Sequence, residues 1–385
     1  MTETFHVESL LEEARRRTGL EDFGDPSFRD GLEVLARSLE EEARLGESGR
    51  AAWRSQILGY LVERLRIEDW YRRHPEIDAQ VVRAPIVVTG LPRTGTTALS
   101  NLLAQDPEAR SLRFWESLRP TPPPEAATQD TDPRIAEADA MLEGMKAAAP
   151  DLAKMHDDNG RSPTENQDLL GQHFRTLHFD GMARVPAYVE WWLSCDMVPA
   201  YRHHRRVLKL LQWRCPPYRW NLKNPPDLFC LEAVTAVYPD ARIVWTHRDP
   251  AKVLPSVCSL VATVRSIFSP EVDRHELGRA QLRLWAEAVR RGMEFRDRVG
   301  EERFVDVRME ELVSDPIVAV ARIYDRFGLV LGEEAQKRMR LWLAENPQGK
   351  HGAHRYDLAD FGLRLGEVRE AFLPYVRRFA VRIEA

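Results

Sequence analysis

One glycine-rich segment, residues 87–103, has the residue types of a phosphate-binding loop but lacks one of its parts. Gly90, Gly95 and the hydroxyl pair Thr96–Thr97 stand where a GxxxxGK[ST] loop has its glycines and its hydroxyl. Thr96, however, occupies the position of the lysine that contacts the β- and γ-phosphates of a nucleoside triphosphate. The cation of this loop is instead Arg93, earlier in the segment. The loop is therefore predicted to hold an anion without the lysine on which nucleoside triphosphate hydrolysis depends.

The loop lies between a predicted strand and a predicted helix. Residues 79–90 change to a short apolar run that ends in glycine, which is typical of a buried parallel strand, and residues 96–107 return to helical spacing. In such a unit the unpaired N–H groups at the start of the helix face a bound anion. Gly95, Thr96 and Thr97 are therefore candidates to bind a phosphate.

Two more cationic residues follow predicted strands. Lys223 ends the strand predicted at residues 219–223, and Arg248 follows the strand predicted at residues 241–247, with Ser256 beyond the next turn. In an open α/β sheet, groups at the carboxyl ends of neighbouring strands converge on one crevice. Lys223, Arg248 and the Arg93 loop should therefore meet.

Taken together, these segments resemble the sulfotransferases that use 3′-phosphoadenosine-5′-phosphosulfate (PAPS). The resemblance covers residues 84–362 and is strongest to the bacterial branch with PRTGT-type loops and to the related tyrosylprotein sulfotransferases. It implies that Arg248 and Ser256 bind the 3′-phosphate of PAPS. It also implies that the segment "LPRTGTT" holds the 5′-phosphate side, through Arg93, Thr94, Gly95, Thr96 and Thr97.

The resemblance implies catalytic roles as well. Lys223, in "LKNP", and Arg93 would stabilise the transferred sulfuryl group and the departing phosphate, and Glu116, in "RFWESLRP", would be the general base. No metal is required by this chemistry. A late basic segment, residues 346–363, looks like the part of the family that closes over the nucleotide; its candidate contacts are Lys350, His351, His354 and Arg355.

The identity of the base stays open. Glu116 is equally compatible with a solvated carboxylate at the rim or an ion pair with Arg119, and the substitutes for it are Glu165, Asp168 and His178. Trp191 and Trp192 fit either an aromatic acceptor pocket or ordinary core packing.

The elements that must position these residues predict an α/β fold. Strands expected at 110–114, 219–223, 241–247 and 302–308 alternate with helical stretches, which indicates a P-loop-like, mainly parallel sheet flanked by helices. Helical periodicity before residue 80 predicts an N-terminal helical extension, residues 1–80, packed on an α/β domain at residues 81–385. Residues 134–214 are predicted to be a helical insertion in that domain.

Composition narrows the class of protein. The 385 residues are 43% hydrophobic and 30% charged, and the net charge of -5 gives no global attraction to nucleic acid or to anionic membranes. The four cysteines show no CxxC spacing, which argues against a zinc knuckle and suits a reducing compartment. The acidic start and the absence of a long apolar run favour a cytoplasmic protein without a membrane span.

The sequence thus predicts a sulfotransferase that moves the sulfuryl group of PAPS to a hydroxyl of a small-molecule, sugar or lipid acceptor. Two alternatives stand beside it. A P-loop small-molecule kinase would require ATP and Mg²⁺, and a non-catalytic nucleotide-binding protein would bind its ligand without turnover. The acceptor and the oligomeric state are left open by the sequence.

Overall fold

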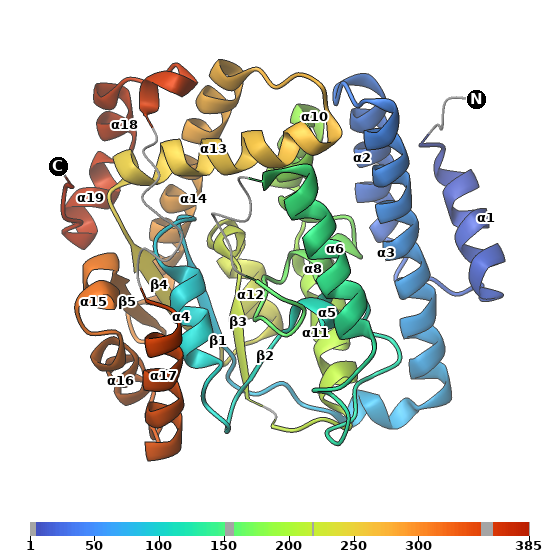
Figure 1. Ribbon diagram of the computed structural model, residues 1–385, viewed down its shortest axis with the longest axis horizontal. Helices are drawn as coiled ribbons and strands as arrows, with labels where there is room; N and C mark the ends of the chain where they lie inside the picture. The colour runs from blue at the N-terminus through green and yellow to red at the C-terminus, as the bar shows by residue number, and fades with distance from the viewer. Residues whose placement is uncertain (1–4, 151–157, 218, 348–356, 385) are drawn as a thin grey trace.

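The computed structural model describes residues 5–150, 158–217, 219–347 and 357–384 (Figure 1). Within these residues, five parallel strands form one sheet in the order β2-β3-β1-β4-β5. The strands are β1 (Ile86–Gly90), β2 (Arg110–Ser111), β3 (Trp220–Lys223), β4 (Arg242–His247) and β5 (Phe304–Arg308). The predicted parallel α/β fold is therefore confirmed.

Strand β1 lies at the centre of the sheet and is buried along its whole length. Its residue Val88 is in register with Lys223 of β3, and its residue Gly90 is in register with Thr246 of β4. Because all three strands run in the same direction, their carboxyl ends meet at one edge of the sheet. Strand β2 is shorter than the predicted 110–114, because helix α5 already begins at Phe114.

Apolar side chains of the strands alternate between two cores, one on each face of the sheet. On β1, Val87 belongs to the larger core, whereas Ile86 and Val88 belong to the smaller one. On β4, Trp245 belongs to the larger core and Val244 to the smaller one. The sheet is thus a layer between two layers of helices, as a parallel sheet requires.

Helices before the sheet form one side of the molecule, drawn in blue in Figure 1. They are α1 (Val7–Thr18), α2 (Phe28–Glu41), α3 (Glu47–Arg73) and the short η1 (Pro75–Ala79). The buried guanidinium of Arg64, on α3, donates hydrogen bonds to the backbone carbonyls of Phe23, Asp25 and Gln172. These bonds tie the N-terminal helices to the chain between β2 and β3. The boundary at residue 80 stays a prediction, because α1–α3 share the larger core with the rest of the chain.

The described region between β2 and β3 contains several helices, and all of them except α5 lie within the insertion predicted at residues 134–214. Its helices are α5 (Phe114–Leu118), α6 (Arg134–Ala148), α8 (Gln167–Gly171), α9 (His178–Met182), α10 (Pro186–Ser194) and α11 (Val198–Gln212). Helix α4 (Thr96–Leu103) follows β1 after a short loop.

The remaining helices alternate with the last strands and then complete the fold. They are η2 (Pro225–Phe229), α12 (Leu231–Val237), α13 (Pro250–Phe268), α14 (Arg274–Val299), α15 (Met309–Ser314), α16 (Pro316–Arg326), α17 (Glu333–Glu345), η3 (Leu358–Phe361), α18 (Leu365–Ala371) and α19 (Leu373–Phe379).

Helix α13 starts directly after β4 and crosses the top of the molecule in Figure 1. In the described part of the chain it is the one helix whose length and composition would suit a membrane span, with a mean hydropathy of 1.4. The uninterrupted apolar runs of the sequence are too short to predict a membrane span. Helix α13 contains Lys252 and Arg265, and its mean hydropathy is nevertheless high because most of its other residues are apolar. Its contacts with α3, α9 and α14 show that it is packed within the fold.

Candidate active site

The loop between β1 and α4 is shaped by two glycines with positive φ. Gly90 has φ 138°, and a Cβ there would lie 2.5 Å from the carbonyl oxygen of Thr246, so no side chain fits between β1 and β4. Gly95 has φ 90° and directly precedes α4. Arg93 also adopts a left-handed backbone conformation, with φ 64°. The chain therefore turns sharply and brings the first N–H groups of α4 to the carboxyl edge of the sheet.

The threonines of the loop have different tasks. The buried hydroxyl of Thr94 donates to the carbonyl of Leu91 at 2.6 Å and shares a second hydrogen bond with the hydroxyl of Thr246 at 2.6 Å. That side chain fixes the shape of the loop, so only the backbone of Thr94 remains for an anion. Thr96 is also buried, whereas Thr97 lies on the wall of a cavity.

Of the groups predicted to meet, Arg93 and Arg248 come together, and Ser256 joins them, whereas Lys223 contacts Glu165. The Nε of Arg93 donates to the hydroxyl oxygen of Ser256 at 3.2 Å, and an NH1 of Arg248 donates to the carbonyl of Arg93 at 3.3 Å. Ser256 lies on the second turn of α13, and Arg248 precedes that helix. Two guanidinium groups and a hydroxyl thus gather where the first N–H groups of α4 emerge, which is an arrangement suited to phosphate groups.

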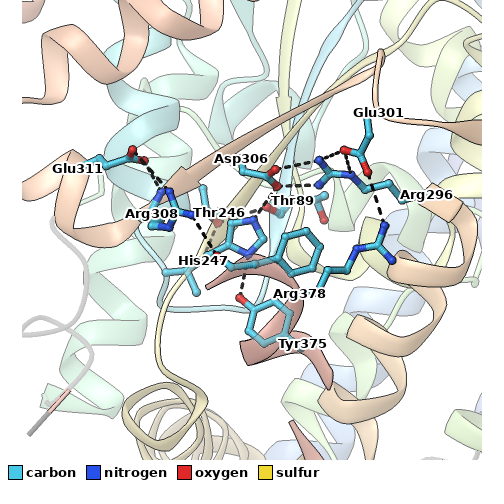
Figure 2. Close-up of polar contacts among 12 residues, drawn as sticks. Thr89, Thr246, His247, Arg296, Glu301, Asp306, Arg308, Glu311, Tyr375 and Arg378 are labelled. Carbon is cyan, nitrogen blue, oxygen red and sulfur yellow. Dashed lines mark hydrogen bonds and ion pairs between the residues drawn. The ribbon is translucent and has the colours of Figure 1, made fainter. Parts of the chain in front are cut away.

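A hydrogen-bond network holds His247, the last residue of β4, in place next to Arg248 (Figure 2). Burial lowers the pKa of His247 despite its hydrogen bond with Asp306, so the ring is neutral. Its Nε2 therefore donates to Asp306 at 2.8 Å, and its Nδ1 accepts from the hydroxyl of Tyr375 at 3.0 Å. Arg296 donates to the same carboxylate at 2.7 Å. Against the opposing effect of burial, the hydrogen bonds from His247 and Arg296 hold the pKa of Asp306 far below its usual range.

On the other side of β1, Lys223 forms an ion pair with Glu165. The distance from its Nζ to the Oε1 of Glu165 is 2.9 Å, and the side chain of Lys223 is only 6% exposed whereas that of Glu165 is 28% exposed. The segment that carries Glu165 is pinned at both ends: the N–H of Thr164 donates to the carbonyl of Leu112, and the N–H of Asn166 donates to the carbonyl of Lys223. Backbone pairing therefore sets the position of this carboxylate.

The turn after Lys223 contains a second acidic group. Burial raises the pKa of Asp227 to about 7. Its carboxylate accepts a hydrogen bond from the hydroxyl of Tyr201 at 2.6 Å and another from the amide of Asn224. Asp227 thus fixes the turn through these hydrogen bonds, whereas Glu165 is the carboxylate that contacts Lys223.

The surroundings of Glu116 are at odds with the role of general base. Its carboxylate is completely buried, forms an ion pair with Arg110, and accepts the N–H of Arg113 at 3.1 Å as part of a capping box at the start of α5. The predicted alternative partner, Arg119, pairs instead with Glu137 at 3.2 Å. Both oxygens of Glu116 are thus used inside the fold, and its side chain does not line the cavity described next. Its place is that of a structural carboxylate.

A cavity of about 890 Å³ opens beside Lys223 and Thr97. Its walls come from α3, α6, α13 and α14, from the loop that carries Glu165, and from the end of β3 at Lys223. The polar groups on its surface include all three substitutes named above for the base, Glu165, Asp168 and His178. Most of the remaining lining is apolar; examples are Leu118, Met141, Met145, Val261, Val264 and Phe268.

The three carboxylate or imidazole groups of the cavity differ in their bonding. Asp168 accepts hydrogen bonds from the hydroxyls of Tyr60, at 2.9 Å, and Ser117, at 3.1 Å. His178 lies at the start of α9 on the cavity wall. Glu165 differs from both because it directly contacts Lys223.

Other predicted residues lie elsewhere. Trp192 is buried edge-on against Phe229, with ring centroids 5.2 Å apart, and Trp191 packs near Tyr188; neither lines the cavity, so both belong to the packing of α10. The predicted nucleotide contacts Lys350, His351, His354 and Arg355 lie outside the described residues. Among the residues that are described, no group of three His, Cys, Asp or Glu side chains is placed to hold a metal ion.

Sequence reasoning missed the contribution of α3 to the cavity. Ala52, Ser55, Gln56 and Gly59 of this helix all line it. Their spacing of three and four residues places small and polar side chains on one helical face. This pattern is the sequence signal from which a cavity wall on α3 could have been predicted. A helix outside the predicted α/β domain thus forms one wall of the site.

Comparisons with known proteins agree on one family. Residues 85–333 match the family model described as "Sulfotransferase family". The crystal structure of sulfotransferase STF9 from Mycobacterium avium is 31% identical, covers 100% of this chain and 99% of its own, and has a TM-score of 0.91. The crystal structure of sulfotransferase STF1 from Mycobacterium tuberculosis is 33% identical, covers 97% of this chain and 100% of its own, and has a TM-score of 0.86.

A curated relative has a named acceptor. Omega-hydroxy-beta-dihydromenaquinone-9 sulfotransferase Stf3 of Mycobacterium bovis is 28% identical over 291 residues, which are 70% of this chain and 69% of the relative.

The buried position of Glu116 makes a prediction about stability. Glu116→Gln should lower the free energy of unfolding by about 3 kcal/mol, because it leaves Arg110 as a buried charge without its partner. Denaturant titration measures this loss. The matched control is Glu137→Gln, which removes the exposed pair with Arg119 and should change stability by less than about 1 kcal/mol. Equal stabilities of the two variants would contradict the structural role of Glu116.

Proposed function

Because the chain belongs to the sulfotransferase family and is a sulfotransferase, we propose that its sulfuryl donor is PAPS and that its acceptor is an apolar molecule with one reactive hydroxyl. The observation that carries this proposal is the contact of Lys223 with Glu165 at the rim of a largely apolar cavity, beside Thr97 of the anion-binding loop. A cation and a carboxylate thus stand together where the loop, the sheet edge and the cavity meet.

The residues at the edge of the sheet fit the donor. PAPS supplies the sulfuryl group and leaves as adenosine 3′,5′-bisphosphate. The first N–H groups of α4 and the side chains of Arg93 and Thr97 would hold the 5′-phosphate. Arg248 and Ser256, which lie beyond Arg93, would hold the 3′-phosphate. Glycine at position 90 lets β1 and β4 lie close together at this edge of the sheet, because no side chain would fit between them.

Lys223 and Arg93 would stabilise negative charge during transfer. Sulfuryl transfer, like phosphoryl transfer, depends on in-line positioning and on cations where charge builds up. Lys223 is suited to this because its side chain is only 6% exposed, which weakens the screening of its charge by water. Arginine stays protonated near neutral pH, so Arg93 acts as a cation and hydrogen-bond donor and not as an acid.

Glu165 would accept the proton of the acceptor hydroxyl. The structure favours it over Glu116 because Glu165 borders the cavity and touches Lys223, whereas Glu116 is enclosed. Its Oε1 accepts a hydrogen bond from Lys223 and its Oε2 accepts one from the side-chain amide of Gln167, so the difference from Glu116 is its place on the cavity surface. An acceptor hydroxyl that enters beside this pair would meet a proton acceptor and a cation at the same point.

The lining of the cavity supports an apolar acceptor. Valine, leucine, methionine and phenylalanine side chains of α6 and α13 face a volume of about 890 Å³, which is large enough for a molecule of drug size or greater. Polar side chains such as Gln56, Asp168 and His178 also line the cavity, but apolar side chains form the larger part of its surface. A lipid-like alcohol or phenol suits it better than a sugar does. The curated relative Stf3, whose name gives a menaquinone derivative as its acceptor, points the same way.

A nucleotide panel tests the donor. Adenosine 3′,5′-bisphosphate should stabilise the protein by about 2.7 kcal/mol at a hundred times its Kd, because it binds only the folded state. Thermal unfolding with the bisphosphate, ADP and ATP with Mg²⁺ measures the order of preference. Stabilisation by ATP with Mg²⁺ above that by the bisphosphate would support the kinase alternative. Binding of the bisphosphate without sulfate transfer to any acceptor would support the non-catalytic one.

Glu165→Gln tests the base. It should lower kcat by about a hundredfold or more, because the amide cannot accept the proton, and should leave bisphosphate affinity unchanged. Sulfate transfer from PAPS and calorimetric binding measure the two quantities. Glu137→Gln, at another carboxylate that lines the cavity, is the control and should keep its turnover. A larger loss of kcat in Asp168→Asn or His178→Asn would assign the base to that residue instead.

Gly59→Leu tests the acceptor cavity. A Cβ at Gly59 meets no atom within 4 Å, so the variant should fold while its side chain fills part of the cavity. With 1-decanol as acceptor, we expect kcat/KM to fall by about tenfold or more and the KM for PAPS to stay unchanged. Gly366→Leu is the control, because that position is equally open but lies on α18, outside the cavity. Faster transfer to glucose than to 1-decanol by the unaltered protein would contradict the apolar acceptor.

A further inference from the structure

Arg248, the residue proposed to bind the 3′-phosphate, is held by a carboxylate from the segment after α19. The Nε and one NH2 of its guanidinium group donate to the two carboxylate oxygens of Glu384 at 2.8 and 3.0 Å. This contact occupies one of the two edges with which a guanidinium group can bind an anion through parallel hydrogen bonds. The hydrogen bonds from Arg248 lower the pKa of Glu384, so the carboxylate is charged.

The backbone fixes Glu384 in this place. Its N–H donates to one carboxylate oxygen of Asp249 at 2.9 Å. The other oxygen of Asp249 accepts the N–H of Ala251 at 2.9 Å and so caps the start of α13. Upstream, the N–H of the buried Val381 donates to the carbonyl of Val376 on α19. The segment is therefore bonded to both helices that flank Arg248.

The second edge of the Arg248 guanidinium group faces the anion-binding loop. Its NH1 lies 3.3 Å from the carbonyl oxygen of Arg93, and the Nε of Arg93 lies 3.2 Å from the hydroxyl oxygen of Ser256. A phosphate between Arg248 and Ser256 would meet this second edge. Glu384 and the phosphate can therefore bind the same arginine on different edges.

We propose that Glu384 is a positioning residue that holds Arg248 with its second edge toward the 3′-phosphate of the donor. This inference rests on the proposed function, since it assumes that Arg248 binds this phosphate. A long flexible arginine loses conformational freedom when it binds an anion, and a partner that orders it beforehand removes part of that cost. Glu384 thereby contributes to the discrimination between nucleotides with and without a 3′-phosphate.

The experiment compares adenosine 3′,5′-bisphosphate with adenosine 5′-monophosphate, which lacks the 3′-phosphate, by titration calorimetry. Glu384→Ala should weaken bisphosphate binding by about threefold to tenfold, the range expected for ordering one long side chain, and leave monophosphate binding unchanged. In sulfate transfer, the KM for PAPS should rise while kcat is kept. In an Arg248→Ala background, Glu384→Ala should have no further effect on bisphosphate binding.

Two further variants complete the design. Glu384→Gln keeps the shape of the side chain and one acceptor oxygen, so it should fold and show a smaller loss of bisphosphate affinity in the same direction. Asp297→Ala is the matched control, because Asp297 pairs with Arg378 on the neighbouring α19 at 2.7 Å, and it should leave both affinities unchanged.

The outcomes separate the inference from its premise. An unchanged ratio of the two affinities in both Glu384 variants would overturn the positioning role. Tighter binding of the bisphosphate would also overturn it, since this would show that Glu384 competes with the phosphate for Arg248. If the unaltered protein binds the bisphosphate no more tightly than the monophosphate, the proposed donor itself fails.

Discussion

The close approach of β1 to β4 at Gly90 is the constraint on which the site depends. A Cβ at this position would lie 2.5 Å from the carbonyl oxygen of Thr246, so the two strands can stay in register to their ends only with glycine here. The loop then turns at Arg93 and Gly95, and the hydroxyl of Thr94 locks that turn to Thr246. One backbone contact thus aligns the anion-binding loop with the residues that follow β4.

Parallel register extends this alignment to the other side of β1. Val88 is paired with Lys223, so the ammonium group emerges at the same edge as the loop. From there the backbone of Lys223 pairs with Asn166 and brings Glu165 to the ammonium group. The loop after β1, the residues after β4 and the Lys223–Glu165 pair are therefore all positioned by the ends of three neighbouring strands.

Much of this frame could be predicted from the sequence because the signals are local. The apolar run before Gly90, the helical spacing after Thr96 and the cations after two further strands are each read from neighbouring residues, and the parallel topology then brings them together. Glu116 shows the limit. The family resemblance implied that it is the base, but only the packing of α5 reveals that its carboxylate turns inward to Arg110. The cavity wall on α3 and the contact of Glu384 with Arg248 join segments far apart in the chain, and sequence periodicity does not show such contacts.

Helix α6 gives the cavity a wall of low local stability. Of its 15 residues only Arg134, Ile135 and Ala138 are buried, all near its start, where they rest against Trp115 of α5. Segments with few buried contacts open with far less free energy than a core strand. The wall can therefore separate from the rest of the cavity while the sheet, its loop and the paired strand ends stay intact. For the apolar acceptor proposed above, entry and exit would then require only this local opening and not the unfolding of the domain.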